Sequence, residues 1–192
     1  MQPDTILLAA ETDRQLLAES LLDHYYAGIH RLALSILQDR AEADDVAQDT
    51  FITALRRIDS YAPGTNMRAW LSTIAVNLSR DRLRRQKIRR KWRELFSSKL
   101  QESPHQSRDL EARHIRREAN TFLWQTVNEL NEKHRLPIIL RYGNGFSPRE
   151  IADVLQIAEG TVHSRLHNAS KKLATALVDS DAESLVLELF NE

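Results

Sequence analysis

The pattern of apolar and polar positions divides the chain into two helical stretches. Apolar residues recur at helical spacing from about Leu16 to Arg90, where the strong break is the loop "YAPGTN" of residues 61–66. A polar segment that contains Pro104 follows, as a linker would, and helical spacing then resumes as far as Leu177. The pattern predicts an all-α chain of two small helical domains joined by a flexible linker. The predicted parts are a first domain of residues 16–93, a linker of residues 94–109, a second domain of residues 110–177 and an acidic amphipathic tail of residues 178–192.

The second domain contains the pattern of a helix-turn-helix in "FSPREIADVLQIAEGTVHSRLHNASKKL", residues 146–173. Ser147 is a suitable N-cap, Pro148 suits the first helical position, and Glu150 completes a capping box. Gly160 is expected in the turn. After it, apolar residues recur on one helix face at Val162, Leu166, Ala169 and Leu173. We therefore expect a short helix, a turn and a second helix; an ordinary helical hairpin is the alternative.

The second of these helices turns hydrogen-bonding side chains away from the core. In a helix-turn-helix, donors and acceptors near the start of the second helix meet base edges in the major groove of DNA. The candidate duplex-binding residues are Thr161, His163, Ser164, Arg165, His167, Asn168 and Lys171. His163 and His167 are also spaced as a metal pair. Neither a glutamate between them in the zincin manner nor a third ligand follows, so we expect no metal.

Charge is unevenly distributed although the net charge of the chain is zero. Residues 1–55 have a net charge of −7, residues 56–93 of +10 and residues 94–192 of −3. The basic block of residues 56–93 is a candidate polyanion-binding surface, and a solvated arginine-rich helix is the alternative. In "EGTVHSRLHNAS", the start of the second helix of the helix-turn-helix, the negative charge of Glu159 and the positive charge of Arg165 cancel. Affinity of this helix for DNA therefore requires positive charge from elsewhere.

The segment "EADDVAQDTFITALRRI", residues 42–58, predicts a helix with an acidic face. One face is apolar and carries Ala47, Phe51, Ala54 and Ile58. The opposite face and its flank carry Asp44, Asp45, Gln48, Asp49, Ile52 and Arg56. An exposed isoleucine among carboxylates favours a protein contact. The alternative is a Mg²⁺ site for nucleic-acid chemistry, but no further ligands complete such a site, so we expect no catalytic residue and no enzyme.

The segment "MRAWLSTIAVNLSRDRLRRQKIRRKWR", residues 67–93, predicts a helix whose exposed face suits unpaired bases. Its core positions are Leu71, Ile74, Ala75 and Leu78. A different face carries Trp70, Thr73, Asn77, Arg80, Asp81 and Arg84, and the preceding loop adds Tyr61 and Asn66. Aromatic rings stack on unpaired bases, amides bond base edges, and arginines follow the backbone. For Trp70, partial burial in the core is the alternative.

Composition excludes several classes of protein. The chain has no cysteine, which excludes disulfides, thiolate zinc sites and cysteine nucleophiles. No run approaches the ~20 apolar residues that span a bilayer, and the amino terminus lacks the features of a secretory signal. We expect a cytoplasmic protein with no membrane insertion and no cofactor.

Taken together, these motifs resemble the extracytoplasmic-function (ECF) group of bacterial RNA polymerase sigma factors. The first domain carries the resemblance in "AEADDVAQDTFITALRRIDSY" and "MRAWLSTIAVNLSRDRLRR", and the second in "LPIILRYGNGFSPREIADVLQIAEGTVHSRL". The matching part covers roughly residues 18–177. The resemblance implies a non-catalytic subunit that binds core RNA polymerase and directs promoter recognition and melting. It also implies regulation by an anti-sigma protein that clamps both domains.

The same resemblance assigns the candidate residues to three surfaces. Binding to the clamp helices of the largest polymerase subunit would use Asp44, Asp45, Gln48, Asp49 and Ile52. The flipped single strand of the −10 promoter element would contact Tyr61, Asn66, Trp70, Asn77, Arg80, Arg84 and Arg85. The second domain would bind the −35 duplex and contact the polymerase flap.

Two features depart from the family pattern. The recognition helix has His163, His167 and Asn168 where relatives often carry arginine or a bulky residue, and "NAS" stands in place of the usual "RAR". We therefore expect weak duplex binding in the absence of polymerase. The tail from Val178 has no clear counterpart in the family.

Two other functions fit parts of the sequence. A stand-alone helix-turn-helix transcriptional regulator would bind duplex DNA tightly without polymerase, but it leaves the arginine face unexplained. A sigma-like decoy would bind an anti-sigma protein in place of DNA. By resemblance, such decoys come with a phosphate-receiver domain, and the β/α alternation of that domain is not found in these 192 residues.

Overall fold

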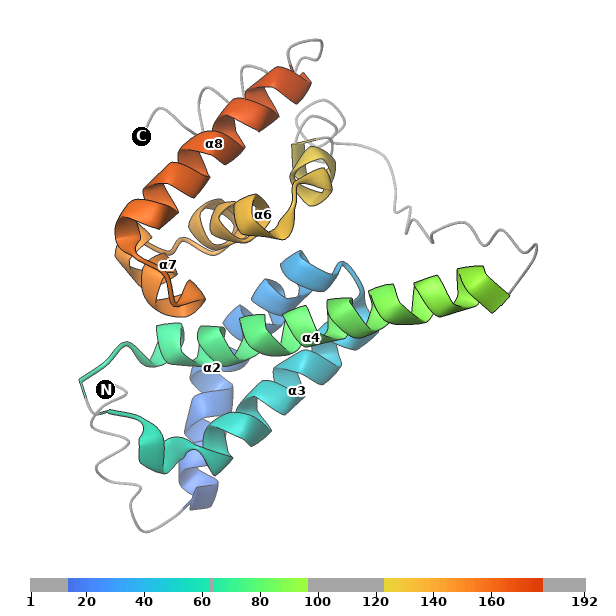
Figure 1. The fold of residues 1–192 in the computed structure, drawn as a ribbon. Coiled ribbons are helices and arrows are strands. Elements are labelled where there is room, and N and C mark those ends of the chain that lie inside the picture. The colour runs from blue at the N-terminus through green and yellow to red at the C-terminus, as the bar shows by residue number, and fades with distance from the viewer. Residues whose placement is uncertain (1–13, 63, 97–122, 178–192) are drawn as a thin grey trace, which may run out of the picture.

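The computed structural model describes residues 14–62, 64–96 and 123–177, and within these residues all regular structure is helical (Figure 1). The first domain consists of α2 (Arg14–Leu37), α3 (Arg40–Arg56), the 3-10 helix η1 (Ile58–Ser60) and α4 (Met67–Phe96). The second consists of a helical segment of residues 123–129, α6 (Glu132–Ile138), the π-helical η2 (Ile139–Gly143), α7 (Pro148–Leu155) and α8 (Glu159–Leu177). The predicted all-α class and the helix-turn-helix are confirmed.

The predicted domain limits fall largely outside the described residues. The helix α4 continues to Phe96, three residues past the expected end of the first domain. Most of the predicted linker, the start of the second domain and the tail lie outside the part of the chain that the structure describes. Those limits stay predictions. None of the helices within the described ranges has the length and apolar character needed to cross a membrane.

Three helices enclose the core of the first domain. Their buried side chains include Ile29, Leu32 and Ile36 of α2, Ala47, Phe51 and Ala54 of α3, and Leu71, Ile74 and Ala75 of α4. These positions recur every three or four residues, which places them on the inward face of each helix. The expected apolar faces are therefore confirmed, although Ile58 and Leu78 are only partly buried.

Local capping groups define where these helices begin. Asp39 is the N-cap of α3, and its Oδ1 accepts a hydrogen bond of 3.0 Å from the Glu42 amide. Gln38, directly before it, has a φ of 57° and turns the chain between α2 and α3. At α4, Asn66 Oδ1 accepts a hydrogen bond of 3.2 Å from the Ala69 amide. Asn66 therefore helps to start the helix that carries most of the basic block.

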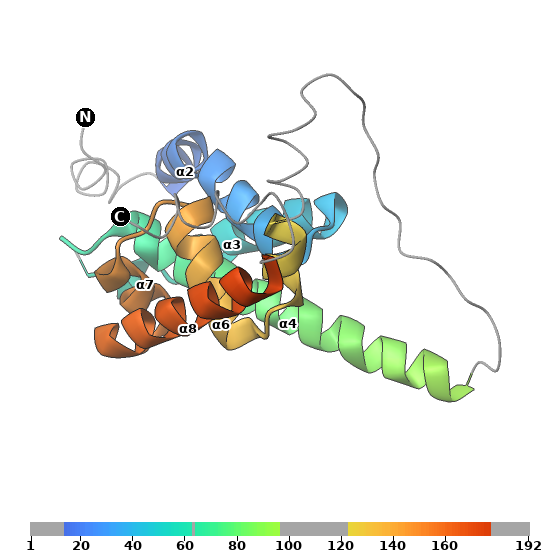
Figure 2. The same cartoon turned by 90° about the horizontal axis from the view of Figure 1, so that it is seen from above.

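The carboxyl half of α4 projects beyond the other helices (Figure 2). Two large apolar side chains on this part, Ile88 and Trp92, are 49% and 58% exposed. The exposed cations on the same part are Arg84, Arg85, Lys87, Arg89, Arg90 and Lys91. Much of the charge of the basic block thus lies on one projecting helix.

In the second domain, an irregular helix precedes the helix-turn-helix. Pro137 lies inside α6, where it removes a backbone donor, and the π-helical turn of η2 follows directly. The capping box of α7 is confirmed. The Ser147 hydroxyl accepts from the Glu150 amide at 3.3 Å, and Glu150 Oε2 accepts from the Ser147 amide at 2.8 Å. The start of α7 is thus fixed by two reciprocal bonds.

The turn of the helix-turn-helix differs from the prediction. The left-handed residue is Gln156, with a φ of 54°, and its amide donates to the Ala152 carbonyl. Gly160 lies in the first turn of α8, so its predicted place in the turn is wrong. The polar Gln156 occupies the conformation for which glycine was expected. Its side-chain amide donates to the Asp153 carbonyl at 2.6 Å, which holds the turn locally.

The two domains pack against each other. One buried cluster continues from α2 and α4 into the second domain and includes Phe146, Ile139 and Leu173. The helix α7 lies against α4, and η2 contacts α2 (Figure 1). Phe146 is fully buried, and the guanidinium carbon of Arg68 lies 4.0 Å from the centroid of its ring. A shared apolar core therefore joins the two sets of helices.

Candidate nucleic-acid interface

The acidic face of α3 has the composition that the sequence predicts. Asp45, Gln48 and Ile52 are exposed, with Ile52 at 47%, whereas Asp44 and Asp49 are partly buried. The Nε2 atom of His30, on α2, lies 2.9 Å from Asp44 Oδ1. The face combines carboxylates and an amide with one large exposed apolar side chain. Such a surface suits a protein partner that offers both cations and an apolar contact.

An arginine of the basic block is bonded to this acidic face. Arg82 Nη1 donates to Glu42 Oε2 at 2.8 Å and to Asp45 Oδ2 at 3.3 Å, and Nη2 donates to Asp49 Oδ2 at 3.1 Å. Burial lowers the pKa of Arg82, but the hydrogen bonds to the three carboxylates outweigh this effect and leave the pKa above its usual value. Arg82 therefore ties α4 to α3 and neutralises part of the acidic face.

The sequence interpretation missed this role of Arg82 and Glu42. The missed signal is helical geometry. Arg82 is two residues from Arg80 and therefore points about 200° around the helix from it. A cation on that side of α4 faces α3 and its carboxylates, whereas the face of Arg80 and Arg84 points elsewhere.

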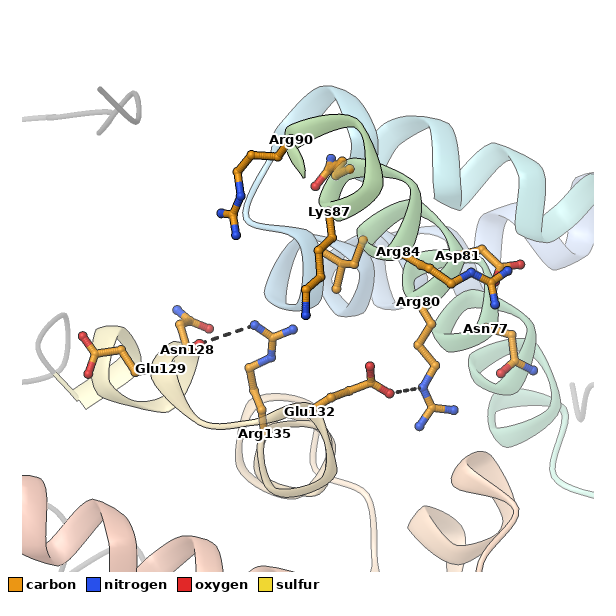
Figure 3. A pocket seen from close by; sticks show the side chains of 12 residues that line it. Asn77, Arg80, Asp81, Arg84, Lys87, Arg90, Asn128, Glu129, Glu132 and Arg135 are labelled. Carbon is orange, nitrogen blue, oxygen red and sulfur yellow. Dashed lines mark hydrogen bonds and ion pairs between the residues drawn. The ribbon is translucent and has the colours of Figure 1, made fainter. Parts of the chain in front are cut away.

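A polar groove of about 1350 Å³ lies between α4 and the segment of residues 123–138 (Figure 3). The cations that line it are Arg80, Arg84, Lys87, Arg90 and Arg135, and the carboxylates are Asp81, Glu129 and Glu132. Asn77, also predicted to contact a base, lines the same groove and is exposed. Cations outnumber carboxylates, so the groove favours an anionic chain.

Several of the groove cations are already paired. Arg80 Nε donates to Glu132 Oε1 at 2.7 Å across the domain boundary, and Arg84 Nη2 lies 3.0 Å from Asp81 Oδ1 (Figure 3). Arg135 is partly buried, and burial lowers the pKa of its guanidinium, although the charge of Glu132 opposes this effect. A nucleic-acid strand in the groove would compete with these carboxylates for the arginines.

The aromatic side chains near the loop of residues 61–66 are not free to stack on a base in this arrangement. Tyr61 is 6% exposed, its hydroxyl donates to the Thr65 carbonyl, and its ring centroid lies 5.3 Å from that of Trp70. Trp70 is partly buried, in line with the core alternative. A base contact through either ring requires movement of the loop, and their predicted role at the −10 element stays a prediction.

Contacts between the domains lie at this same loop. Asn66 Nδ2 donates to Glu150 Oε1 at 2.7 Å, and Arg68 donates to the Asn144 carbonyl. Burial alone would raise the pKa of Glu150, but hydrogen bonds from Ser147 and Asn66 and the charge of Arg68 leave the pKa below its usual value. The start of α4 is thus held against the start of α7.

The recognition helix α8 presents its predicted polar face. Val162, Ala169 and Leu173 are buried and Leu166 partly so, which orients the helix. His163, Ser164, His167, Asn168 and Lys171 are exposed, and Thr161 and Arg165 are partly buried. His163 Nε2 lies 3.8 Å from Glu159 Oε1. Within residues 14–62, 64–96 and 123–177, no three potential ligands gather in a metal-binding cluster.

Comparison with known proteins gives the class of both domains. Residues 21–89 match the Sigma-70 region 2 family, and residues 123–173 match the Sigma-70, region 4 family. Two regions of sigma factors thus follow one another in the order that the fold shows.

Relatives over most of the chain define the group more closely. The chain is 34% identical over 173 residues to the ECF RNA polymerase sigma factor EcfG of Rhodopseudomonas palustris, which covers 87% of this chain and 90% of the relative. It is 33% identical over 162 residues to SigL of Mycobacterium tuberculosis, another ECF sigma factor, covering 84% and 89%. The chain belongs to the ECF RNA polymerase sigma factors. It therefore directs transcription initiation, as the resemblance of its motifs implied.

Solved structures agree with this assignment. The sigma factor RpoE from Bartonella quintana, in complex with the anti-sigma factor NepR, is similar with a TM-score of 0.63 and 26% identity over 85% of this chain and 97% of that chain. CnrH in complex with the cytosolic domain of CnrY is similar with a TM-score of 0.65 and 27% identity, over 94% and 99%. Both the fold and the sequence thus place the chain among sigma factors.

Proposed function

We propose that this sigma factor divides its tasks among three surfaces. The acidic face of α3, with Asp44, Asp45, Gln48, Asp49 and Ile52, binds the clamp helices of core RNA polymerase. The groove along α4 holds the opened strand of the −10 element. The exposed face of α8 reads the −35 duplex, and polymerase supplies the attachment that its neutral composition lacks.

The observation that carries this proposal is the opposite orientation of neighbouring arginines on α4. Arg82 bonds the acidic face of α3, while Arg80 lines the groove and bonds Glu132 of the second domain. The two surfaces therefore lie on different sides of one helix. One protein can then hold polymerase on one side and a single strand on the other without competition between them.

The closed contact between the domains also bears on the proposal. Asn66 and Arg80, both proposed to contact the −10 element, bond Glu150 and Glu132 of the second domain. A strand that contacts Arg80 in the groove must replace Glu132, and a strand that also contacts Asn66 must replace Glu150. We propose that polymerase separates the domains before the strand is captured.

Run-off transcription with purified core polymerase and promoters that the protein recognises tests this division. Arg80→Ala with Arg84→Ala should reduce open-complex formation at least tenfold and leave binding to core polymerase unchanged, because the groove loses its phosphate and base contacts. Asp45→Arg with Asp49→Arg should reduce binding to core polymerase about tenfold or more, because like charges would meet at the interface.

A matched control uses two exposed acidic residues on another helix of the same domain. Glu19→Arg with Asp23→Arg makes the same change in charge on α2, where both side chains are exposed, and should leave core binding near normal. Loss of core binding in the Arg80 and Arg84 variant, or normal core binding in the Asp45 and Asp49 variant, would contradict the assignment of surfaces.

We propose, further, that an anti-sigma protein regulates this chain. The similar RpoE structure is a complex with the anti-sigma factor NepR, and that sigma factor matches the present chain across both domains. Co-purification of this chain from its own cells, followed by run-off transcription with the captured partner, tests the idea. A captured partner that leaves run-off unchanged would contradict it.

A further inference from the structure

A second, smaller cleft lies in the helix-turn-helix domain between the start of α6 and the second half of α8, two helices that pack against each other. Its volume is about 610 Å³. The lining residues are Lys133, His134, Asn168, Lys171, Lys172, Thr175 and Ala176. Three of them are lysines and none is a carboxylate. Among the described residues no carboxylate forms an ion pair with any of the three lysines.

A buried histidine at the base of this cleft experiences the same positive charge. His134 is 6% exposed, and its Nδ1 has no hydrogen-bond partner within the described part of the chain. Burial lowers the pKa of His134, and the charges of Lys172, Lys133 and Arg165 lower it further. The cleft is therefore a concentrated positive site with an unused polar atom beneath it, and it suits an anionic group.

The chain itself provides a complementary segment immediately after α8. Residues 178–192, "VDSDAESLVLELFNE", contain five carboxylate side chains and neither lysine nor arginine. Thr175 and Ala176 line the cleft, and Asp179 follows Ala176 by three residues. The Cα of Asp179 therefore lies within about 11 Å of the Cα of Ala176, whatever path the chain takes. Charge and chain continuity together select this segment as the occupant.

We propose that residues 178–183 of this chain dock on the cleft and pair Asp179, Asp181 and Glu183 with its lysines. Lys171 and Asn168, which line the cleft, also belong to the face proposed to bind the −35 duplex. A carboxylate of the docked tail then pairs with the ammonium group of Lys171, which would otherwise neutralise a DNA phosphate. This competition with DNA rests on the proposed function, whereas the docking itself does not.

Lysine acylation of the intact chain, without DNA or polymerase, tests the docking directly. Each lysine is labelled at low conversion with an amine-reactive acetyl reagent, and its rate is measured by mass spectrometry. A tail contact with a Kd of about 0.5 mM would be about two-thirds occupied at an effective concentration of ~1 mM. Neutralising the tail with Asp179→Asn, Asp181→Asn and Glu183→Gln should then accelerate labelling of Lys133, Lys171 and Lys172 about threefold.

Internal and variant controls make the result specific. Lys87 and Lys91, on the projecting part of α4, should keep their labelling rates in the neutralised variant. Glu188→Gln with Glu192→Gln removes charge from the distal half of the tail and should leave the cleft lysines near their original rates. In a Lys133→Gln, Lys172→Gln background, neutralising the tail should change the rate of Lys171 by a smaller factor, because the three lysines act together.

Equal rates at the cleft lysines with and without the three tail charges would overturn the proposal. An equal increase at Lys87 and Lys91 would also overturn it, because that would show a general effect of net charge. Protection that grows with protein concentration would assign the cleft to the tail of a second copy and contradict docking within one chain. The labelling experiment contains neither DNA nor polymerase. A failure of the proposed function in run-off transcription would therefore not change the labelling rates, and it can be told apart from a failure of the docking.

Discussion

In this sigma factor, one arginine joins the basic block to the acidic face of α3, which the charge pattern of the sequence separates. Arg82 belongs by sequence to the basic block, yet three carboxylates of the acidic face accept its hydrogen bonds. The guanidinium and Glu42 are mostly shielded, at 26% and 22% exposure, whereas Asp45 and Asp49 are more open. Arg82 is therefore a structural cation, and the count of +10 overstates the charge that the basic block offers to DNA.

Substitution of Arg82 should reveal this structural role. Arg82→Gln should lower the free energy of unfolding by about 1–2 kcal/mol, because Glu42, Asp45 and Asp49 lose the counter-charge that they share. Urea unfolding monitored by circular dichroism provides the measurement. Arg89→Gln, at an exposed position further along α4, is the matched control and should change stability by less than about 0.5 kcal/mol. Equal effects of the two substitutions would contradict the role assigned to Arg82.

Glu150 should make the stability of the protein dependent on pH. Its folded-state pKa lies below the usual value of 4.5, so its ionised form stabilises the fold above that value. This contribution is lost as the pH falls through the folded-state pKa. Wild type should therefore be more stable than the Glu150→Gln variant above about pH 5, and the difference should shrink at lower pH. Urea unfolding of both proteins between pH 3 and pH 7 measures the difference in their free energies of unfolding. A difference that stays constant over this range would contradict a contribution from the ionised Glu150 carboxylate.

At the scale of elements, Gly160 belongs to a helix of the helix-turn-helix and not to the turn in which the sequence predicted it. Gly160 lies in the first turn of α8, and a Cβ added there meets no atom within 4 Å. Gly160→Ala should therefore raise the free energy of unfolding by about 0.5–1 kcal/mol, because alanine favours the helix and has less freedom in the unfolded chain. Thermal or urea unfolding checks the sign.

Gly145 provides the matched comparison. It also has open space around its Cα, but its φ is +69°. Gly145→Ala should therefore destabilise the protein by about 1 kcal/mol, since L side chains rarely adopt this backbone conformation. Opposite signs at the two glycines are expected, and stabilisation by Gly145→Ala would contradict the backbone geometry described for the loop before α7.

The elements that the sequence predicts well are those governed by neighbours in the chain. The capping box of Ser147 and Glu150, the apolar face of α3 and the outward polar face of α8 all follow from spacing of three or four residues. The turn at Gln156 escaped prediction because glycine is the expected left-handed residue, and a glycine happens to stand four positions later. Periodicity also gives no sign of the π-helical turn after Pro137.

Contacts between distant segments could not be predicted in the same way. The bonds from Asn66 to Glu150 and from Arg80 to Glu132 join residues that are 84 and 52 positions apart. The helix face and the loop predicted the candidate −10 residues, but only the folded structure shows that Tyr61 is buried and that Asn66 and Arg80 bond the second domain. Their roles at the promoter stay predictions.

At the scale of the whole molecule, the shared core predicts one closed arrangement for the free protein. Spin labels at Arg57→Cys and Asp153→Cys, one in each domain, are unambiguous because the chain has no other cysteine. Electron paramagnetic resonance should give one narrow distance distribution for the free protein. Core polymerase should add a longer distance, since the proposed capture of the −10 strand requires the domains to separate. An unchanged distribution in the transcribing complex would contradict that requirement.

The two oxygens of the Glu150 carboxylate have separate partners. Oε1 accepts from Asn66 in the first domain, whereas Oε2 accepts from the amide and hydroxyl of Ser147 at the head of α7. In the proposed separation of the domains, Oε1 would exchange Asn66 for water, whereas the bonds at Oε2 lie within the second domain and would persist. The helix α8, proposed to read the −35 duplex, would therefore reach the promoter with α7 already folded, and opening of the domain contact would require no refolding of α7.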